Sequence, residues 1–500
     1  MGSTLQRVYP TGVPVSFEAP AMDSAPPRPI YFVLLPAVLT VGGVLSWIIS
    51  GDLGLLLGCV IATIIGLFTL WEWLFRQAPT RISTMLAMSL LLGYGAGALN
   101  TWLTLPRGNL TVGQYIGIGK GALAHGMAAV LLSTVLLYFL GEIVEKPLFR
   151  PGYQLQITDS TRSLIYFGLC AMLIGYATHS VVMSGAAAAE GHANKLGLFL
   201  IWLYVPITAL ASVAFLRSNR GRERLLTGLC ALTLLAMLAV RGRRGAIYTT
   251  VEIVFVLGLS GYQWRGKGAR NTILLALLGG VILSTSLIFM LLRVAPVNQV
   301  GNKPPTIAQK AAGAEQLYKQ GGAVALAVQA TQQNVQTRTL VLSFLASILD
   351  ATSTKTPAHG RDALGLIEVA IPSAIDPGKN RYFSEEELVD QLFGFGFGDQ
   401  PNSILTAGAT DFGLAGIIIY PILLVMLARI VFALLSMVLK PLPLMVVALA
   451  YIYLFLQTEV GLTDYFADIR NAIVFGLVVQ LFLSLPRLKF RGQHAPHGGW

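Results

Sequence analysis

The sequence predicts an all-α polytopic membrane protein with about twelve transmembrane helices, both termini in the cytoplasm and one large helical loop on the outer side. Of 500 residues, 54% are hydrophobic and only 12% are charged, and the mean hydropathy is +0.67. Soluble domains carry about 25% charged residues. Apolar runs of spanning length also recur along the chain. So little polar surface cannot cover a soluble body, which makes the lipid bilayer the natural solvent.

The apolar runs define the predicted helices. Each crossing of about 30 Å of hydrocarbon needs about 20 residues. The predicted spans are 30–50, 53–75, 82–105, 121–141, 163–187, 196–216, 225–240, 245–262, 272–293, 404–436, 444–458 and 471–486.

The spans divide the chain into five parts. Residues 1–29 are polar and proline-rich, which predicts a disordered cytoplasmic tail rather than a cleavable signal peptide. Residues 30–293 hold the first nine helices, and 294–403 form the large periplasmic loop. Residues 404–486 hold the last three helices, and 487–500 form a cytoplasmic tail.

The distribution of Lys and Arg sets the orientation. With the N-terminus inside, the cytoplasmic ends of the runs carry 18 of these residues and the short outer loops carry 7. This bias places both termini in the cytoplasm. Arg241, Arg243 and Arg244 break the trend, because they stand together on the outer side. The alternative is a re-entrant hairpin that puts this turn inside, but it would expose the basic stretches 217–224 and 263–270 outside.

The loop 294–403 is too long for an idle connection, which indicates a folded or functional element. Residues 307–332 are rich in Ala and Gln, and 334–350 carry an apolar stripe, so both predict helices. Ser384-Glu-Glu-Glu387 reads as a capping box that opens a short helix. The stretch Gly394-Phe-Gly-Phe-Gly398 then precedes the next span.

Composition also excludes several classes of site. The basic charges lie between apolar runs, as the positive-inside pattern requires, so we expect no nucleic-acid partner. Cys59, Cys170 and Cys230 lie in apolar runs and are expected to be buried small hydrophobic residues without a disulfide. No metal-ligand spacing, phosphate-binding loop or Ser-His-Asp signature is present, so no cofactor is predicted.

The arginine cluster is the first candidate site. Guanidinium groups bind phosphate oxygens with two parallel hydrogen bonds and stay charged beside lipid. Arg241, Arg243 and Arg244 between two helices would therefore suit a diphosphate, although they could instead reach outer lipid headgroups. Three further arginines could contact the same anion, or could be a helix anchor and two solvated loop charges: Arg293, Arg361 and Arg381.

Candidate proton acceptors lie on the same predicted face. His359 is the only histidine of the loop and could act as a general base for a sugar hydroxyl, or be a surface residue. Glu252 lies two turns into the helix after the arginines, where an acid is either functional or their ion-pair partner. Asp399 is a third candidate, and Asp411 is a further outer acid without an assigned role.

Two stretches carry a resemblance to a known family. They are the turn Val240-Arg-Gly-Arg-Arg-Gly-Ala246 and the re-entry Pro401-Asn-Ser-Ile-Leu-Thr-Ala-Gly-Ala-Thr-Asp-Phe-Gly-Leu-Ala-Gly416. With the predicted topology, they resemble the Wzy-type O-antigen and exopolysaccharide polymerases. The resemblance covers roughly 240–420; the first third of the chain is similar only in hydropathy.

The resemblance implies a metal-independent membrane glycosyltransferase of the GT-C type in the bacterial inner membrane. Its donor and acceptor would be undecaprenyl-diphosphate-linked glycans joined on the periplasmic face. A chain-length regulator and a flippase are the candidate protein partners, besides membrane lipids. The related O-antigen ligases carry a His-Asn pair before the re-entry helix, where this sequence has Pro401-Asn402-Ser403.

Three other functions remain open from the sequence. One is an O-antigen ligase, which the missing histidine before Asn402 disfavours. Twelve helices with both termini inside also suit a flippase or transporter for a lipid-linked sugar. Transporters usually show internal repeats and a central cytoplasmic loop, whereas this chain has its large loop outside after the ninth span. A scaffold without catalytic activity in a polysaccharide assembly complex is the third reading.

Overall fold

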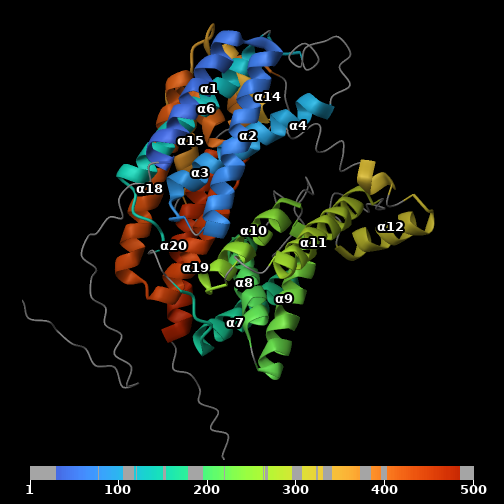
Figure 1. Ribbon diagram of the computed structural model, residues 1–500. Coiled ribbons are helices and arrows are strands. Elements are labelled where there is room, and N and C mark those ends of the chain that lie inside the picture. The colour runs from blue at the N-terminus through green and yellow to red at the C-terminus, as the bar shows by residue number, and fades with distance from the viewer. Residues whose placement is uncertain are drawn as a thin grey trace, which may run out of the picture.

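The fold is built from helices, and no strand occurs among the residues that the structure describes (Figure 1). This computed structural model describes residues 30–76, 78–104, 117–119, 121–149, 154–177, 195–218, 220–241, 243–262, 264, 268–295, 307–322, 325–329, 341–371, 385–395 and 402–484.

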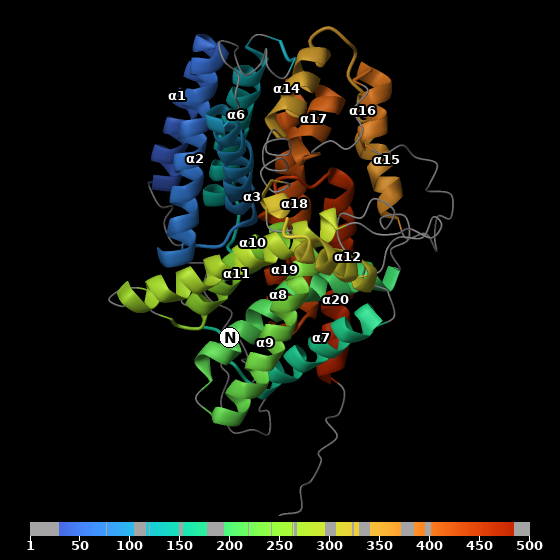
Figure 2. The ribbon, with the colours of Figure 1, turned by 90° about the vertical axis from the view of Figure 1, so that its right-hand side faces the viewer.

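The N-terminal helices stand side by side and form one end of the bundle (Figure 2). The chain enters through η1 (Ile30–Leu34) and α1 (Leu35–Ile49), turns at Ser50, and returns through α2 (Gly51–Arg76). A single helical path then combines α3 (Ile82–Leu90), the π-helical stretch η2 (Leu91–Ala96) and α4 (Gly97–Thr104), and α6 (Ala122–Ile143) follows. Helix α1 packs against α2 and α6, which buries the small residues that line their contacts.

A second group of helices follows in the chain. It contains α7 (Asp159–Ala177), α8 (Lys195–Arg217), α9 (Gly221–Arg241), α10 (Arg243–Leu259) and α11 (Gly268–Val294). Helix α8 packs against α7, α9 and α10, and α10 also contacts α2 and α19. In Figure 2, α11 runs across the direction of α1 and α2 rather than alongside them.

The C-terminal helices complete the core. They are α17 (Ile404–Phe412), α18 (Leu414–Val438), α19 (Pro441–Phe455) and α20 (Leu462–Ser484). The predicted single span 404–436 is in fact two helices, because Gly413 breaks it with a φ of 57°. Backbone at this φ favours glycine, which has no Cβ to clash.

Part of the predicted outer loop is folded against the bundle. Its described helices are α12 (Ile307–Lys319), α14 (Val341–Thr352), α15 (Arg361–Ala370) and α16 (Glu385–Phe393). Helix α14 buries its apolar stripe against α6 and α17. Its Leu342 and Ala346 face Gly126 near the start of α6. Helix α14 is therefore part of the core, although the sequence placed it in a loop.

The helices support a multi-pass membrane protein by their length and composition. Among the residues whose side chains the structure describes, five shorter helical stretches of 10–17 residues are apolar, and they include α1, α14 and α19. A 15-residue helix spans about 22 Å, less than the hydrocarbon thickness of about 30 Å. Six described helices are long and apolar enough to cross: Gly51–Arg76, Ile82–Thr104, Ala122–Ile143, Gly268–Leu292, Leu414–Val438 and Leu462–Ser484. The twelve spans of the sequence analysis stay a prediction.

The cysteines differ from the prediction at one position. Cys59 and Cys230 are buried, as expected, but Cys170 on α7 is exposed. An apolar run does not show which side of its helix faces the bundle, and Cys170 lies on the outward side.

Candidate functional site

The arginine turn joins two apolar helices. Arg241 is the last residue of α9 and Arg243 is the first residue of α10, so a single residue separates the two helices in the chain. Arg293 is near the end of α11, which packs against both α9 and α10. The structure describes the backbone of these arginines and of Arg244; their side-chain placement lies outside what it describes.

Glu252 is enclosed in the bundle. Its exposed fraction is 0%, and neither carboxylate oxygen has a hydrogen-bond partner. Tyr248, one turn earlier, packs edge-on against Tyr453 of α19. Phe255, one turn later, stacks on Trp73 of α2. In this conformation a substrate hydroxyl cannot reach the carboxyl group, so its catalytic role stays a prediction that requires α10 to move.

His359 and Arg361 are exposed where α15 begins. The chain reverses here with left-handed backbone at His359, whose φ is 55°, and at Gly360, whose φ is 85°. The backbone N–H of Ala358 donates to the carbonyl of Thr410 at 2.9 Å, and that of His359 donates to the carbonyl of Asp411 at 2.9 Å. The last turn of α17 therefore fixes the backbone that carries the imidazole.

Asp411 holds the same segment through its side chain. The carboxylate is fully buried. It accepts the N–H of Asp362 at 3.0 Å and the N–H of Ala363 at 3.0 Å. It also accepts the hydroxyl of Tyr420 on α18. Asp411 thus caps α15 from a distant part of the chain and neutralises part of its N-terminal dipole.

Asp362 lies directly beside this cap. Its side chain is 3% exposed, and its Oδ2 atom has no hydrogen-bond partner. Burial, and then the charge of Asp411, raise the pKa of Asp362 to about 8. Sequence reasoning assigned neither acid a role, because their contact joins residues far apart in the chain.

A buried chain of hydroxyl groups fixes the other end of α17. Ser403 forms a capping box with Thr406. The hydroxyl of Tyr94 lies 2.6 Å from that of Ser403. The hydroxyl of Thr406 donates to Glu385 of α16 at 3.0 Å. The small-polar re-entry segment thus connects η2, α16 and α17, and positions Asp411 relative to the bundle.

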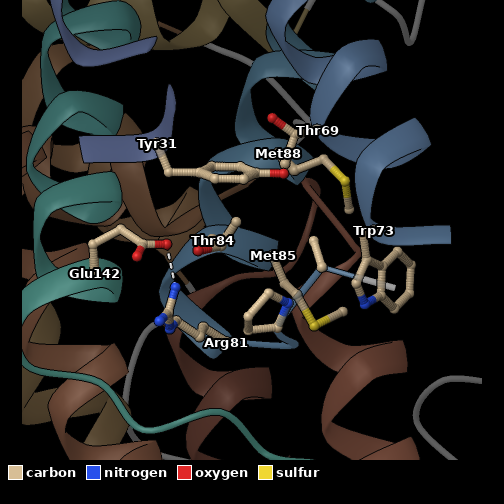
Figure 3. A pocket seen from close by; sticks show the side chains of 10 residues that line it. Tyr31, Thr69, Trp73, Arg81, Thr84, Met85, Met88 and Glu142 are labelled. Atoms are coloured by element: carbon tan, nitrogen blue, oxygen red, sulfur yellow. Dashed lines mark hydrogen bonds and ion pairs between the residues drawn. The ribbon is translucent and has the colours of Figure 1, made fainter. Parts of the chain in front are cut away.

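A separate polar cluster follows the end of α2 at Arg76, and Figure 3 shows its Arg81 and Glu142 side chains pointing toward each other. Arg81 forms an ion pair with Glu142 of α6. Glu145 accepts the N–H groups of Ile82 at 2.6 Å and Ser83 at 2.9 Å, which caps α3. The adjoining cavity has room for about one water molecule. Its lining combines Arg81 and Glu142 with two threonines, Thr69 and Thr84, and with aromatic and apolar side chains. Its small size suits a structural role.

The remaining predicted residues and ligands can be placed only in part. Asp399 and Arg381 lie outside the described residues. Helix α15 packs against α16, α17 and α20, whereas α10 packs mainly against α2, α8, α9, α11 and α19. His359 and Glu252 therefore lie on or beside helices that pack against different parts of the bundle. Among the described residues, no three His, Cys, Asp or Glu side chains gather closely enough to hold a metal ion.

Comparison with models of protein families, with curated proteins and with solved structures yields no match. The function is therefore inferred from the chain itself.

Proposed function

We propose that this protein is a membrane glycosyltransferase that joins undecaprenyl-diphosphate-linked repeat units into a surface or extracellular polysaccharide. The reaction would take place on the periplasmic face of a bacterial inner membrane. The multi-pass helical fold, the arginine turn and the resemblance of 240–420 to Wzy-type polymerases support the proposal.

The observation that carries the proposal is the position of Arg241, Arg243 and Arg244. They stand where one apolar helix ends and the next begins, within four residues. Three adjacent cations repel one another, and positive charge is disfavoured on the outer side of the membrane. A polyanion such as a lipid-linked diphosphate would offset both effects through charge-assisted hydrogen bonds.

The chemistry needs little beyond positioning and charge stabilisation. The acceptor hydroxyl oxygen forms a bond to the anomeric carbon of the donor while the bond from that carbon to the diphosphate oxygen breaks. Fixed guanidinium groups stabilise the negative charge that develops on the diphosphate. The hydroxyl proton passes to a base or to the released diphosphate.

The exposed end of α15 supplies the candidate base. His359 faces outward beside Arg361, on backbone that α17 holds in place. Arg361, Arg381 and Arg293 are the candidates for further contacts to the donor. Asp399 and Glu252 are the alternatives to His359, and Glu252 would need α10 to open.

A cell strain that lacks the protein distinguishes this proposal from the flippase hypothesis. Loss of a polymerase leaves single repeat units on the lipid carrier in the outer leaflet and no polymer. Loss of a flippase leaves those units in the inner leaflet. Single units found only in the inner leaflet would overturn the proposal, and unchanged polymer would exclude both functions.

A further inference from the structure

The buried acids at the start of α15 have an arrangement that the glycosyl transfer does not explain. Asp411 accepts two backbone N–H groups of α15 and the hydroxyl of Tyr420. These donors and the N-terminal dipole of α15 all favour its ionised form. Asp411 is therefore the member of the pair whose carboxylate has hydrogen-bond donors around it.

Asp362 is in the opposite situation. It is almost completely buried, and no donor reaches its Oδ2 atom. An ionised Asp362 would be an unpaired buried charge next to a second carboxylate, which both desolvation and repulsion disfavour. The closed arrangement therefore requires a proton on Asp362.

We propose that Asp362 and Asp411 form a proton-binding latch that holds residues 358–363 against the α17–α18 hairpin. With the proton bound, Asp411 caps α15 and the segment is closed. When the proton leaves, the two carboxylates repel each other and the first turn of α15 separates from α17. Asp362 and Asp411 are positioning residues, because they act through the backbone that carries His359 and Arg361.

The surrounding charges do not compensate for ionisation of Asp362. Helix α18 contributes the hydroxyl of Tyr420, which already donates to Asp411. Helix α16 contributes Glu385, whose negative charge also acts on Tyr420. Helix α20, which packs against α15, carries the acids Asp464 and Asp468 and the cation Arg470, whose charge interacts with that of Asp468. His359 and the cation Arg361 on the segment itself are exposed to solvent.

The sign of the pH dependence follows from the raised pKa of Asp362, about 8 in the closed state. In an open, solvated segment its pKa would be about 3.9. Between these values the closed state binds one more proton than the open state. The ratio of closed to open segment is thus highest at acidic pH and falls by up to about tenfold per pH unit as the pH rises toward 8.

The statement that the latch orients groups for glycan transfer rests on the proposed function. The existence of the latch does not depend on that function. Its test is therefore independent of activity. Hydrogen–deuterium exchange of the full-length protein in detergent, corrected for the intrinsic pH dependence of exchange, reports the opening ratio. The N–H groups to follow are those of His359, Asp362 and Ala363.

The same helix hairpin provides matched control amides. The N–H groups of Leu405 and Thr406 are bonded to the hydroxyl of Ser403 at the other end of α17. We expect protection of the segment to fall between pH 5 and 8 while protection of these controls stays constant. In Asp362→Asn the segment should be equally protected throughout, and in Asp411→Asn it should be poorly protected throughout.

Three results would overturn the latch. One is protection of the segment that does not change with pH in the wild-type chain. Another is an equal change in the control amides of Leu405 and Thr406, which would indicate opening of the whole hairpin. The third is an unchanged pH dependence in Asp362→Asn. The first two results are measured on the wild-type chain alone. They therefore test the latch even if a variant does not fold.

Discussion

Asp411 accepts the backbone N–H of Asp362 at 3.0 Å, although 49 residues separate the two acids in the chain. This contact connects the re-entry hairpin α17–α18 with the exposed segment that carries His359. It also shows how the long connection after α11 becomes part of the bundle.

The orientation is tested with reporter fusions. The excess of 18 cytoplasmic over 7 outer Lys and Arg residues predicts that residue 267 is inside and residue 320 outside. A reporter active only in the cytoplasm should work when fused at 267 and be silent at 320. Activity at 320 would reverse the orientation and move the proposed chemistry to the other face.

The close approach of α17 and α18 predicts a strong effect of a single methyl group. A Cβ at Gly416 would lie 1.8 Å from the backbone oxygen of Gly408, so the two helices would have to separate. We expect Gly416→Ala to destabilise the protein by more than the 1–3 kcal/mol or so that is typical of overpacking. Thermal unfolding in detergent measures the change.

Gly279→Ala is the matched control. Gly279 lies inside α11, and a Cβ there would meet no atom within 4 Å. Alanine is favoured over glycine inside a helix by about 1 kcal/mol. The control should therefore be neutral or stabilising. Equal stability of the Gly416 and Gly279 variants would contradict the described hairpin packing.

The arginine turn should be essential for activity and dispensable for folding. A hydrogen bond to a charged group contributes about 1.5–3 kcal/mol. Replacing Arg241, Arg243 or Arg244 by Ala should then lower polymer formation by roughly 10- to 100-fold each. Lysine should rescue poorly, because it lacks the planar fork of arginine.

The control for this series lies at the other end of α9. Arg222 is exposed there, and its replacement by Ala should leave polymer formation unchanged. Membrane insertion of every variant is checked by its amount in the membrane fraction. Full activity of all three arginine-turn variants would exclude the diphosphate-binding role.

His359→Ala tests the candidate general base. Removing a base should lower turnover by about 10²–10⁴-fold without weakening donor binding. In the wild type, activity should fall toward acidic pH, because a protonated imidazole cannot accept the hydroxyl proton. An unchanged rate and pH profile in the variant would remove His359 from the mechanism.

Two carboxyl variants complete the comparison in the same assay. If Glu252→Gln or Asp399→Asn abolishes transfer while His359→Ala does not, the base is a carboxylate. If all three variants remain active, the released diphosphate takes the proton itself. The buried position of Glu252 leads us to expect that Glu252→Gln retains activity.

Much of the helical framework could be predicted from hydropathy alone. The predicted span 53–75 corresponds to α2 (Gly51–Arg76), and 121–141 corresponds to α6 (Ala122–Ile143). Long apolar runs define such helices because the backbone must satisfy its own hydrogen bonds in lipid. The break at Gly413 was missed, because residues 404–436 are mostly apolar and hydropathy does not report the backbone conformation of a single glycine.

The candidate site could be predicted only where it is local in the chain. The arginine turn is visible in seven consecutive residues, and the structure keeps it between two helices. The cap of α15 by Asp411 is a long-range contact, and no spacing in the sequence predicts it. The burial of α14 was also missed, because an apolar stripe does not identify the surface on which it packs.

The central claim is that this chain by itself lengthens a lipid-linked glycan. The most direct measurement incubates the purified protein in lipid nanodiscs with an undecaprenyl-diphosphate-linked repeat unit and follows product length by gel electrophoresis and mass spectrometry. We predict a ladder that grows by whole repeat units with release of undecaprenyl diphosphate, and no ladder with the Arg243→Ala protein. Unchanged single units with correctly inserted wild-type protein and the matching repeat unit would contradict the claim.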